Sequence, residues 1–259
     1  MAWSDLGTQF CLELAVGVLV AMAFVPKAPV VVLFYRVMGT SALVPCLVAL
    51  VIPPWVGLIP WLSVETFAIG VAVAAFPFYS GPLRGKPWAA SLGVAILGCA
   101  VALAVTIGRS VPDAGPRALA VVSALATGTV AGSVGLAMVL GHWYLTVPNL
   151  AVSHLRRLNR VTVASMVVSL VAIAASCLMF QAHLESAKTP LFGPWGLFHL
   201  GTRVVVGLAL PLLFAWMTAS SLKFENTRSA TGILYASTVL VLIGAAVSLS
   251  LKDSYGIPL

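Results

Sequence analysis

The stretch PWGLFHLGTRVVVGLALP, Pro194–Pro211, is an apolar run that carries two ionisable side chains, His199 and Arg203, one helical turn apart. A run of this length and apolarity is typical of a membrane-spanning helix, which needs about 20 residues to cross the hydrocarbon. Because ionisable groups are costly in hydrocarbon, those that a span retains are candidates for a function. The stretch therefore predicts a membrane span that carries a polar site.

The rest of the chain is equally apolar. Of its 259 residues, 61% are hydrophobic and 8% are charged, and the mean hydropathy is +1.08. A water-soluble domain of this length could not cover its surface with so few polar side chains. The apolar runs are continuous and about 20 residues long, unlike the short alternating segments of a membrane β-barrel. The composition therefore predicts an all-α integral membrane protein, with residues 1–259 forming a single transmembrane helical domain.

Charged residues, prolines and glycines divide the chain into eight apolar runs with short connections, so we expect a bundle of about eight transmembrane helices and no soluble domain. The amino-terminal segment has no basic region and no A-x-A cleavage site, so we expect the first run to be retained as a span. The predicted spans are 8–26, 29–52, 56–80, 87–108, 116–146, 158–182, 194–221 and 229–251. Four cysteines, Cys11, Cys46, Cys99 and Cys177, fall within these runs without C-x-x-C spacing, and we expect them to be buried as small hydrophobic residues.

The lysines and arginines are unevenly shared between the two sides of the predicted bundle. The loops after the first, third, fifth and seventh spans contain Lys27, Arg84, Lys86, Arg156, Arg157, Arg160, Lys223 and Arg228. Cytoplasmic loops carry the excess of positive charge, so both termini are expected outside, in a membrane of the bacterial inner-membrane type. We interpret the net charge of +7 as a result of this excess in the loops and not as a sign of nucleic-acid binding. Arg156, Arg157 and Arg160 are expected to meet anionic lipid headgroups.

The two halves of the chain, 1–110 and 116–259, carry similar patterns that suggest an internal repeat. The range Pro60–Pro77 has the same proline spacing as Pro194–Pro211. When the two ranges are aligned, Glu65 occupies the position that corresponds to His199. Weaker similarities pair Arg36 with Arg160, and LGCAVAL at 97–103 with IGAAVSL at 243–249. Because each half would contain an even number of spans, the sequence predicts two parallel four-helix repeats related by an axis along the membrane normal.

Four ionisable residues, Glu13, Glu65, His199 and Arg203, are expected in the outer half of the bilayer, as a ligand or proton site. The two carboxylates could neutralise Arg203, and His199 lies on the same helix face as Arg203. With Trp61, Trp195 and Phe198 as aromatic walls, the histidine could hydrogen-bond a quinone carbonyl and pass its protons outward. The same residues could instead bind an ion, or form an ion pair that only holds the helices together.

A second polar site is expected toward the cytoplasmic side, at Arg36 and His142. A buried imidazole at His142 would need a partner, such as a haem iron, a quinone oxygen or a backbone carbonyl. His142 and His199 are possible haem ligands, but not to one haem, since they should lie roughly 20–25 Å apart along the membrane normal at about 1.5 Å per residue. Pairing either one with His154 or His183 would use residues in or beside loops.

The chain has no Walker A loop, H-E-x-x-H, C-x-x-C-H, G-x-S-x-G or dinucleotide-binding motif, which argues against an ATP-driven pump, a zinc protease or a c-type cytochrome. We expect a membrane-anchoring subunit of a larger respiratory or electron-transfer complex, with other membrane or peripheral redox subunits as partners and a quinone or haem b site in the bilayer. One alternative is a small transporter or a proton or ion conduit that uses the intramembrane Glu, His and Arg side chains. Another is a structural or assembly scaffold.

Overall fold

The computed structural model describes residues 3–25, 32–52, 63–111, 113–147, 150–187, 189–257 and 259. Every regular element in these ranges is a helix, which confirms the prediction of a helical membrane bundle. The helices are α1 (Trp3–Ala23), α2 (Val32–Val51), α3 (Val64–Ser80), α4 (Gly85–Ser110), α5 (Ala114–Thr146), α6 (Ser153–Met179), α7 (Gln181–Glu185), α8 (Pro194–Gly201), η2 (Thr202–Ala209), α9 (Leu210–Lys223) and α10 (Thr227–Tyr255).

The helices account for eight apolar spans in the described part of the chain. Seven are long and apolar enough to cross a membrane, and α8, η2 and α9 together form one of these seven, Pro194–Lys223. The eighth, α3, is also apolar but has only 17 residues. Its predicted start at 56 lies outside the described residues. Large apolar side chains such as Phe67, Leu178 and Trp216 are exposed, as expected for an integral membrane protein whose outer surface faces lipid.

Several helix ends differ from the prediction by a few residues, and the differences at α6 and α10 move basic residues into helices. Helix α6 begins at Ser153 instead of 158, so the basic segment 154–160 forms its first turns. Helix α10 runs to Tyr255 instead of 251, and it ends where Gly256 adopts a left-handed conformation with φ of 70° and donates its N–H to the carbonyl of Lys252. Lys252, expected in an outer loop, is therefore a buried residue of α10.

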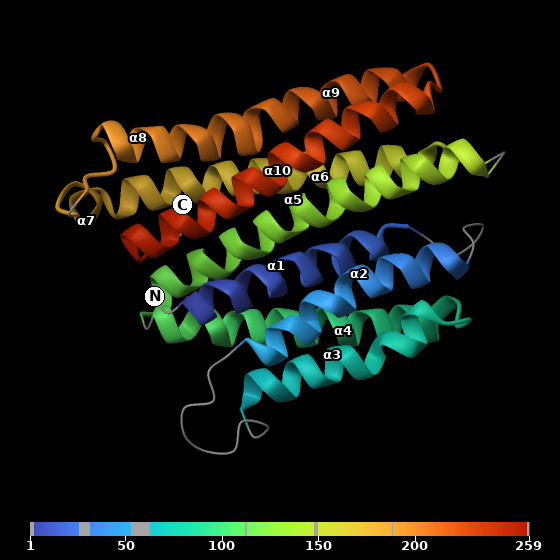
Figure 1. Cartoon of the computed structure of the whole chain (residues 1–259), viewed down its shortest axis with the longest axis horizontal. Helices are drawn as coiled ribbons and strands as arrows, with labels where there is room; N and C mark the ends of the chain where they lie inside the picture. The colour runs from blue at the N-terminus through green and yellow to red at the C-terminus, as the bar shows by residue number, and fades with distance from the viewer. Residues whose placement is uncertain are drawn as a thin grey trace.

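All the long helices run roughly along the same direction, and both chain termini lie at the same end of the bundle (Figure 1). We call this end the terminal end. The last turns of α1, α3, α5 and α9 and the first turns of α2, α4, α6 and α10 lie at the opposite end, which we call the basic end (Figure 1). The described basic residues in or beside these helix turns are Arg84, Lys86, Arg156, Arg157, Arg160, Lys223 and Arg228. Lys27 lies outside the described residues.

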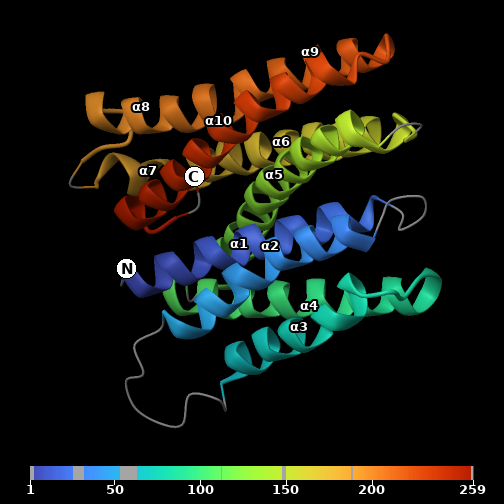
Figure 2. The same cartoon turned by 45° about the vertical axis from the view of Figure 1, so that its right-hand side comes forward.

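The bundle consists of two groups of helices that meet along α1 and α5 (Figure 2). In the first group, α1 packs against α2 and α4, and α3 packs against α4. In the second group, α5 packs against α6 and α10, and η2 and α9 pack against α10. The order of contacts is thus the same in residues 3–110 and 114–255, and an internal duplication stays a prediction.

The two groups approach closely because glycines lie where α1 and α5 cross. A Cβ atom added to Gly17 would lie 1.8 Å from the carbonyl oxygen of Gly128, and one added to Gly132 would lie 2.1 Å from the carbonyl carbon of Gly17. No side chain larger than hydrogen fits at these positions, so the two backbones are in direct contact. This crossing brings the polar side chains of α1 next to those of the second group.

Candidate functional site in the bundle core

Arg203 is the most deeply buried charged side chain at the centre of the second group. It lies on η2 and is only 2% exposed. Its Nη2 donates to Thr127 Oγ1 on α5 at 2.8 Å and to Ser169 Oγ on α6 at 3.3 Å. Its Nε has no hydrogen-bond acceptor among the described residues. The guanidinium is therefore held by neutral hydroxyl groups, with one donor left unpaired.

The helix that carries Arg203 changes its winding at this point. Residues Thr202–Ala209 form a π-helical segment, in which the N–H of Leu210 bonds to the carbonyl of Val205. The segment is pressed against α10, since a Cβ added to Gly207 would lie 2.6 Å from the Cα atom of Gly244. Short π-helical segments often occur at functional sites, because they shift the direction of side chains on an otherwise regular helix. Here the segment carries the one arginine that is buried in the core.

A second set of buried polar groups joins α1 to α10. Gln9 Nε2 donates to Glu13 Oε1 at 2.6 Å, and Lys252 Nζ donates to Gln9 Oε1. All three side chains are buried. Gln9 thus bridges an acid and an amine that come from opposite ends of the sequence.

The two sets lie close enough for their charged side chains to interact electrostatically, although no hydrogen bond or ion pair joins them among the described residues. Glu13 interacts electrostatically with both Arg203 and Lys252. We call this group the core polar site. Its members are Gln9, Glu13, Thr127, Ser169, Arg203 and Lys252, from α1, α5, α6, η2 and α10. Of the predicted outer residues, Glu13 and Arg203 are therefore brought together, while the other two lie elsewhere.

Glu65 belongs to a different cluster, at the terminal end of α3 and α4. Its carboxylate pairs with Arg109 and accepts a hydrogen bond from Thr106 Oγ1 at 2.7 Å. Arg109 also reaches Asp5 Oδ1 on α1 at 3.3 Å. Arg109 was expected in an outer loop, but α4 extends to Ser110, so the arginine belongs to the last turn of the helix and contacts Glu65 of α3.

His199 lies away from the core polar site, although it is only one turn from Arg203 in sequence. Its ring is partly exposed, its Nδ1 bonds to the carbonyl of Trp195 at 2.8 Å, and Phe198 contacts it edge-on with ring centroids 5.7 Å apart. Trp195 and Phe198 are exposed, and Trp61 lies outside the described residues.

The predicted inner pair, Arg36 and His142, lies toward the basic end with both side chains exposed. Neither side chain takes part in a hydrogen bond or ion pair with another described residue. The other two histidines are placed differently: His154 is buried on α6, and His183 Nε2 bonds to the carbonyl of Tyr255 at 2.9 Å. His142 and His199 lie toward opposite ends of the bundle, as expected for residues that cannot share one haem.

The three arginines of the basic segment have separate surroundings. Arg156 Nη2 donates to the carbonyl of Leu222 at 2.6 Å, which ties α6 to the end of α9. Arg157 Nη1 donates to the carbonyl of Phe24 at 3.4 Å, just beyond the end of α1. Arg160 is exposed. Only the last two face the groove between α1, α5 and α6.

Sequence reasoning missed Lys252 and the uncharged members of the core polar site. Lys252 could have been found from the stop signal that follows it, since Gly256 comes one turn later and glycine commonly ends a helix. Gln9, Thr127 and Ser169 carry no charge and stand in apolar runs where such residues are common. Their role follows only from which helices pack together.

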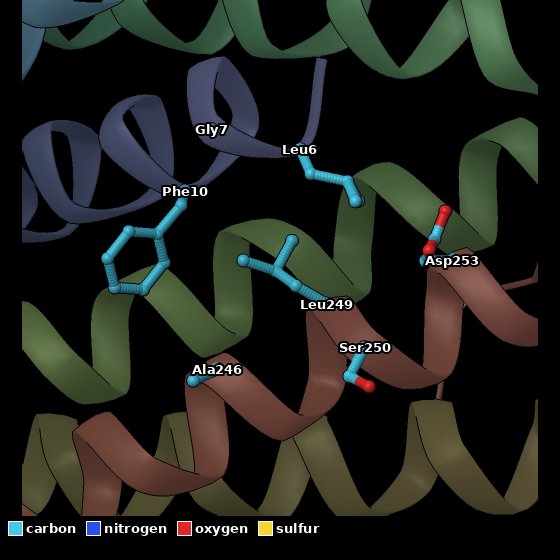
Figure 3. A pocket seen from close by; sticks show the side chains of 7 residues that line it. All are labelled: Leu6, Gly7, Phe10, Ala246, Leu249, Ser250 and Asp253. Atoms are coloured by element: carbon cyan, nitrogen blue, oxygen red, sulfur yellow. The ribbon is translucent and has the colours of Figure 1, made fainter. Parts of the chain in front are cut away.

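A cavity of about 430 Å³ lies between α1 and α10 near the terminal end. Figure 3 shows that its wall is formed by Leu6, Gly7 and Phe10 of α1 and by Ala246, Leu249, Ser250 and Asp253 of α10. Gln9 and Lys252 lie between these residues in sequence, so the cavity is adjacent to the contact that joins them. It is mostly apolar, with Ser250 and Asp253 as its polar side chains.

No group of three or more His, Cys, Asp and Glu side chains in the described ranges is placed to hold a metal ion. All four cysteines are free thiols, and Cys46 and Cys99 are buried with their sulfur atoms 3.5 Å apart. No family model matches the chain, and neither a curated protein nor a solved structure matches it.

Proposed function

We propose that this chain is a small membrane transporter or ion conduit, and that the core polar site is its binding site. The observation that carries the proposal is Arg203, a buried guanidinium whose hydrogen-bond partners among the described residues are two hydroxyl groups and whose Nε is unpaired there. A buried charge that lacks a direct ion pair destabilises a fold strongly. Such residues inside a membrane bundle are typical of ion and substrate pathways.

The balance of charge favours an anionic ligand. The site holds two cationic side chains, Arg203 and Lys252, and one carboxylate, Glu13, which interacts with both of them. An anion bound at Arg203 would supply the acceptor that Nε lacks. Protonation of Glu13 would remove the carboxylate that competes with this anion for the two cations. Binding of a proton and binding of an anion therefore favour each other, which is the coupling that a symporter needs.

The location of the site also supports transport. Glu13 and Gln9 come from the first group of helices, whereas Arg203 and Lys252 come from the second, so the site lies where the two groups meet. In many transporters the substrate site lies at the interface between repeats, beside helices whose regular winding is interrupted. The π-helical segment that carries Arg203 is such an interruption.

The proposed orientation follows from the basic end, which would face the cytoplasm under the positive-inside rule. The terminal end, with the cavity beside Gln9 and Lys252, would then open outward. In a bacterial inner membrane, alkaline phosphatase fused after residue 259 should be active, and the same enzyme fused after Lys223 should be inactive. The opposite result would reverse the proposed orientation.

Transport is tested in liposomes that contain the purified protein and a pH-sensitive dye. Inward gradients of potassium chloride, sulfate, phosphate and succinate are imposed one at a time, with protein-free liposomes as the baseline. We expect at least one anion to acidify the interior through the protein. Arg203→Gln and Glu13→Gln should each lower that rate at least tenfold. Arg36→Gln, an exposed arginine outside the site, should keep it.

Two results would contradict the proposal. One is the absence of any signal above the protein-free baseline with all four anions. The other is a rate that survives both core substitutions in protein that elutes as the wild type does on size-exclusion chromatography. If the two variants lose transport only because they unfold, their elution and melting temperature reveal it, and Arg203→Lys, which keeps the charge, then serves as the test of the site.

A second candidate function is the quinone-binding or haem-bearing anchor subunit of an electron-transfer complex. The observation in its favour is His199, which is partly exposed beside Trp195 and Phe198, where a quinone or a partner subunit could reach it. An oxidised-minus-reduced visible spectrum of the purified protein and extraction of its lipids for quinone test this candidate. The absence of both a haem band and a quinone would remove it.

A further inference from the structure

A long furrow runs along the outside of the bundle between α5 and α6, starting near the basic end. It consists of two adjoining hollows of about 450 and 280 Å³ that share Thr129, Ala164 and Ser165. The first hollow continues to α1 through Val20 and Phe24, and the second continues along α5 and α6 to Val122 and Val168. Apart from two arginines and two small hydroxyl residues, the lining is apolar.

The two arginines, Arg157 and Arg160, both lie at the basic end of the furrow, where α6 begins. The contact between Arg157 Nη1 and the carbonyl of Phe24 holds that side chain beside the end of α1. No acidic residue lines either hollow. The furrow is thus positively charged at one end and apolar along the rest of its length.

The length of the furrow matches one leaflet of a bilayer. Arg157 and Val168 mark its two ends on α6, and they are separated by roughly 16 Å at a helical rise of about 1.5 Å per residue. Half of the hydrocarbon core of a bilayer is about 15 Å thick. The charged end therefore lies at the level of the headgroups, and the apolar part lies at the level of the acyl chains.

We propose that this furrow binds one anionic phospholipid from the leaflet at the basic end. Arg157 and Arg160 contact its phosphate, and one acyl chain lies between α5 and α6 over Ala164 and Ser165. A zwitterionic lipid carries no net charge to match the two guanidinium groups, so the site selects the anionic headgroup. Arg156, tied to Leu222, does not belong to this site. The inference is independent of the proposed transport function.

The bound lipid would join the two groups of helices. The furrow is lined by α1 of the first group and by α5 and α6 of the second. A ligand that binds only the folded, assembled bundle stabilises it by mass action. We therefore expect the anionic lipid to raise the melting temperature of the protein in detergent.

The experiment compares phosphatidylglycerol with phosphatidylcholine, added at equal concentration to the delipidated full-length protein. Bound lipid is counted by native mass spectrometry, and melting temperature is measured in parallel. The wild type should retain phosphatidylglycerol in preference to phosphatidylcholine. The double substitution Arg157→Gln/Arg160→Gln should weaken this retention about tenfold, since each arginine near a membrane surface attracts anionic lipid appreciably. Arg36→Gln/Arg84→Gln removes the same charge at exposed positions of the same end and should retain phosphatidylglycerol.

A third variant tests the furrow itself. Ala164 is exposed and lines both hollows, so Ala164→Phe fills the acyl-chain path while both arginines remain. We expect it to lower phosphatidylglycerol retention too. Equal loss in the Arg157/Arg160 and Arg36/Arg84 doubles, or full retention in Ala164→Phe, would overturn the proposal, because binding would then depend on net charge alone. Displacement of the lipid by millimolar inorganic phosphate would also overturn it, since the acyl chain would then contribute nothing.

Discussion

Two arginines of this bundle, Arg109 and Arg203, have very different surroundings. Arg109 is 42% exposed at the side chain and pairs directly with two carboxylates, whereas Arg203 is almost fully buried and bonds to hydroxyl groups. The two carboxylates neutralise the charge of Arg109, so this guanidinium is already paired and is not a candidate for ligand binding. The surroundings of Arg203 leave a donor unused. This contrast is why the proposed site lies at Arg203.

The pairing of Glu65 with Arg109 should measurably stabilise the contact between α3 and α4. Glu65 is buried but Arg109 remains partly exposed, and ion pairs that water still reaches contribute up to about 1 kcal/mol. We expect a coupling free energy of about 1 kcal/mol in a double-mutant cycle of Glu65→Gln and Arg109→Gln, measured from unfolding in detergent. A coupling near zero would mean that Thr106 and Asp5 hold the two side chains independently of each other.

Gln9 should be indispensable to the core polar site because it accepts from Lys252 and donates to Glu13. Gln9→Leu removes both bonds and leaves two buried charged groups short of a partner, which should cost about 3 kcal/mol of unfolding free energy. In Gln9→Leu/Lys252→Met one of those charges is gone as well. The double variant should therefore lose less stability than the sum of the single variants, as measured by thermal unfolding. An additive loss would contradict the bridging role of Gln9.

At the residue scale, sequence alone identified Glu13 and Arg203 as unusual, because a charge within an apolar run stands out. It could not identify their partners. Whether Glu65 meets Arg109 or Arg203 depends on which helix lies next to α3, and hydropathy carries no information on that. Lys252 was assigned to a loop because the end of a helix is set by its capping residue, Gly256, rather than by the decline of apolarity.

At the level of helices, the glycines of α5 differ in whether a neighbouring helix packs directly against them. A Cβ on Gly128 would lie 2.2 Å from the carbonyl oxygen of Glu13, and one on Gly141 would lie 2.6 Å from Thr231 Oγ1. At Gly135, by contrast, nothing lies within 4 Å. The sequence does not distinguish these glycines from one another, since their spacing does not tell which face of the helix has a neighbour.

This difference gives a matched pair of variants in one helix. Gly128→Ala must push α1 away from α5 and should destabilise the bundle by about 2 kcal/mol, as overpacking does. Gly135→Ala meets open space and should leave stability unchanged or raise it by up to about 1 kcal/mol through helix propensity. The melting temperatures of the two variants in the same detergent test this. Equal effects of the two substitutions would contradict the close crossing of α1 and α5.

The spans could be predicted to within a few residues at most ends, because the thickness of the bilayer sets the length of an apolar run that crosses it. The π-helical segment Thr202–Ala209 could not be predicted. That segment depends on tertiary packing, in which η2 presses against α10 at Gly207 and Gly244. The segment reads TRVVVGLA, with three valines and one glycine, and this composition is otherwise compatible with a regular helix.

For the whole molecule, the main feature is that the core polar site is divided between two groups of helices. The first group, residues 3–110, contributes Gln9 and Glu13, and the second, residues 114–255, contributes Thr127, Ser169, Arg203 and Lys252. Each group has its own helix contacts, in the same order, and the two meet mainly through α1 and α5. Each should therefore be able to form its own helix contacts, while neither alone contains the complete site.

This division predicts that the chain can be cut between the groups. Residues 1–111 and 112–259, co-expressed as separate chains with a tag on the first only, should co-purify from detergent, because the break falls in the turn between α4 and α5 and leaves the crossing of α1 and α5 intact. Gly128→Leu in the second chain should abolish co-purification, since its side chain cannot fit against the backbone of Glu13. Gly135→Leu, on the same helix but facing open space, should preserve it. If the split chains did not associate, or if both leucine variants behaved alike, the two groups could not be independent units joined by the α1–α5 contact.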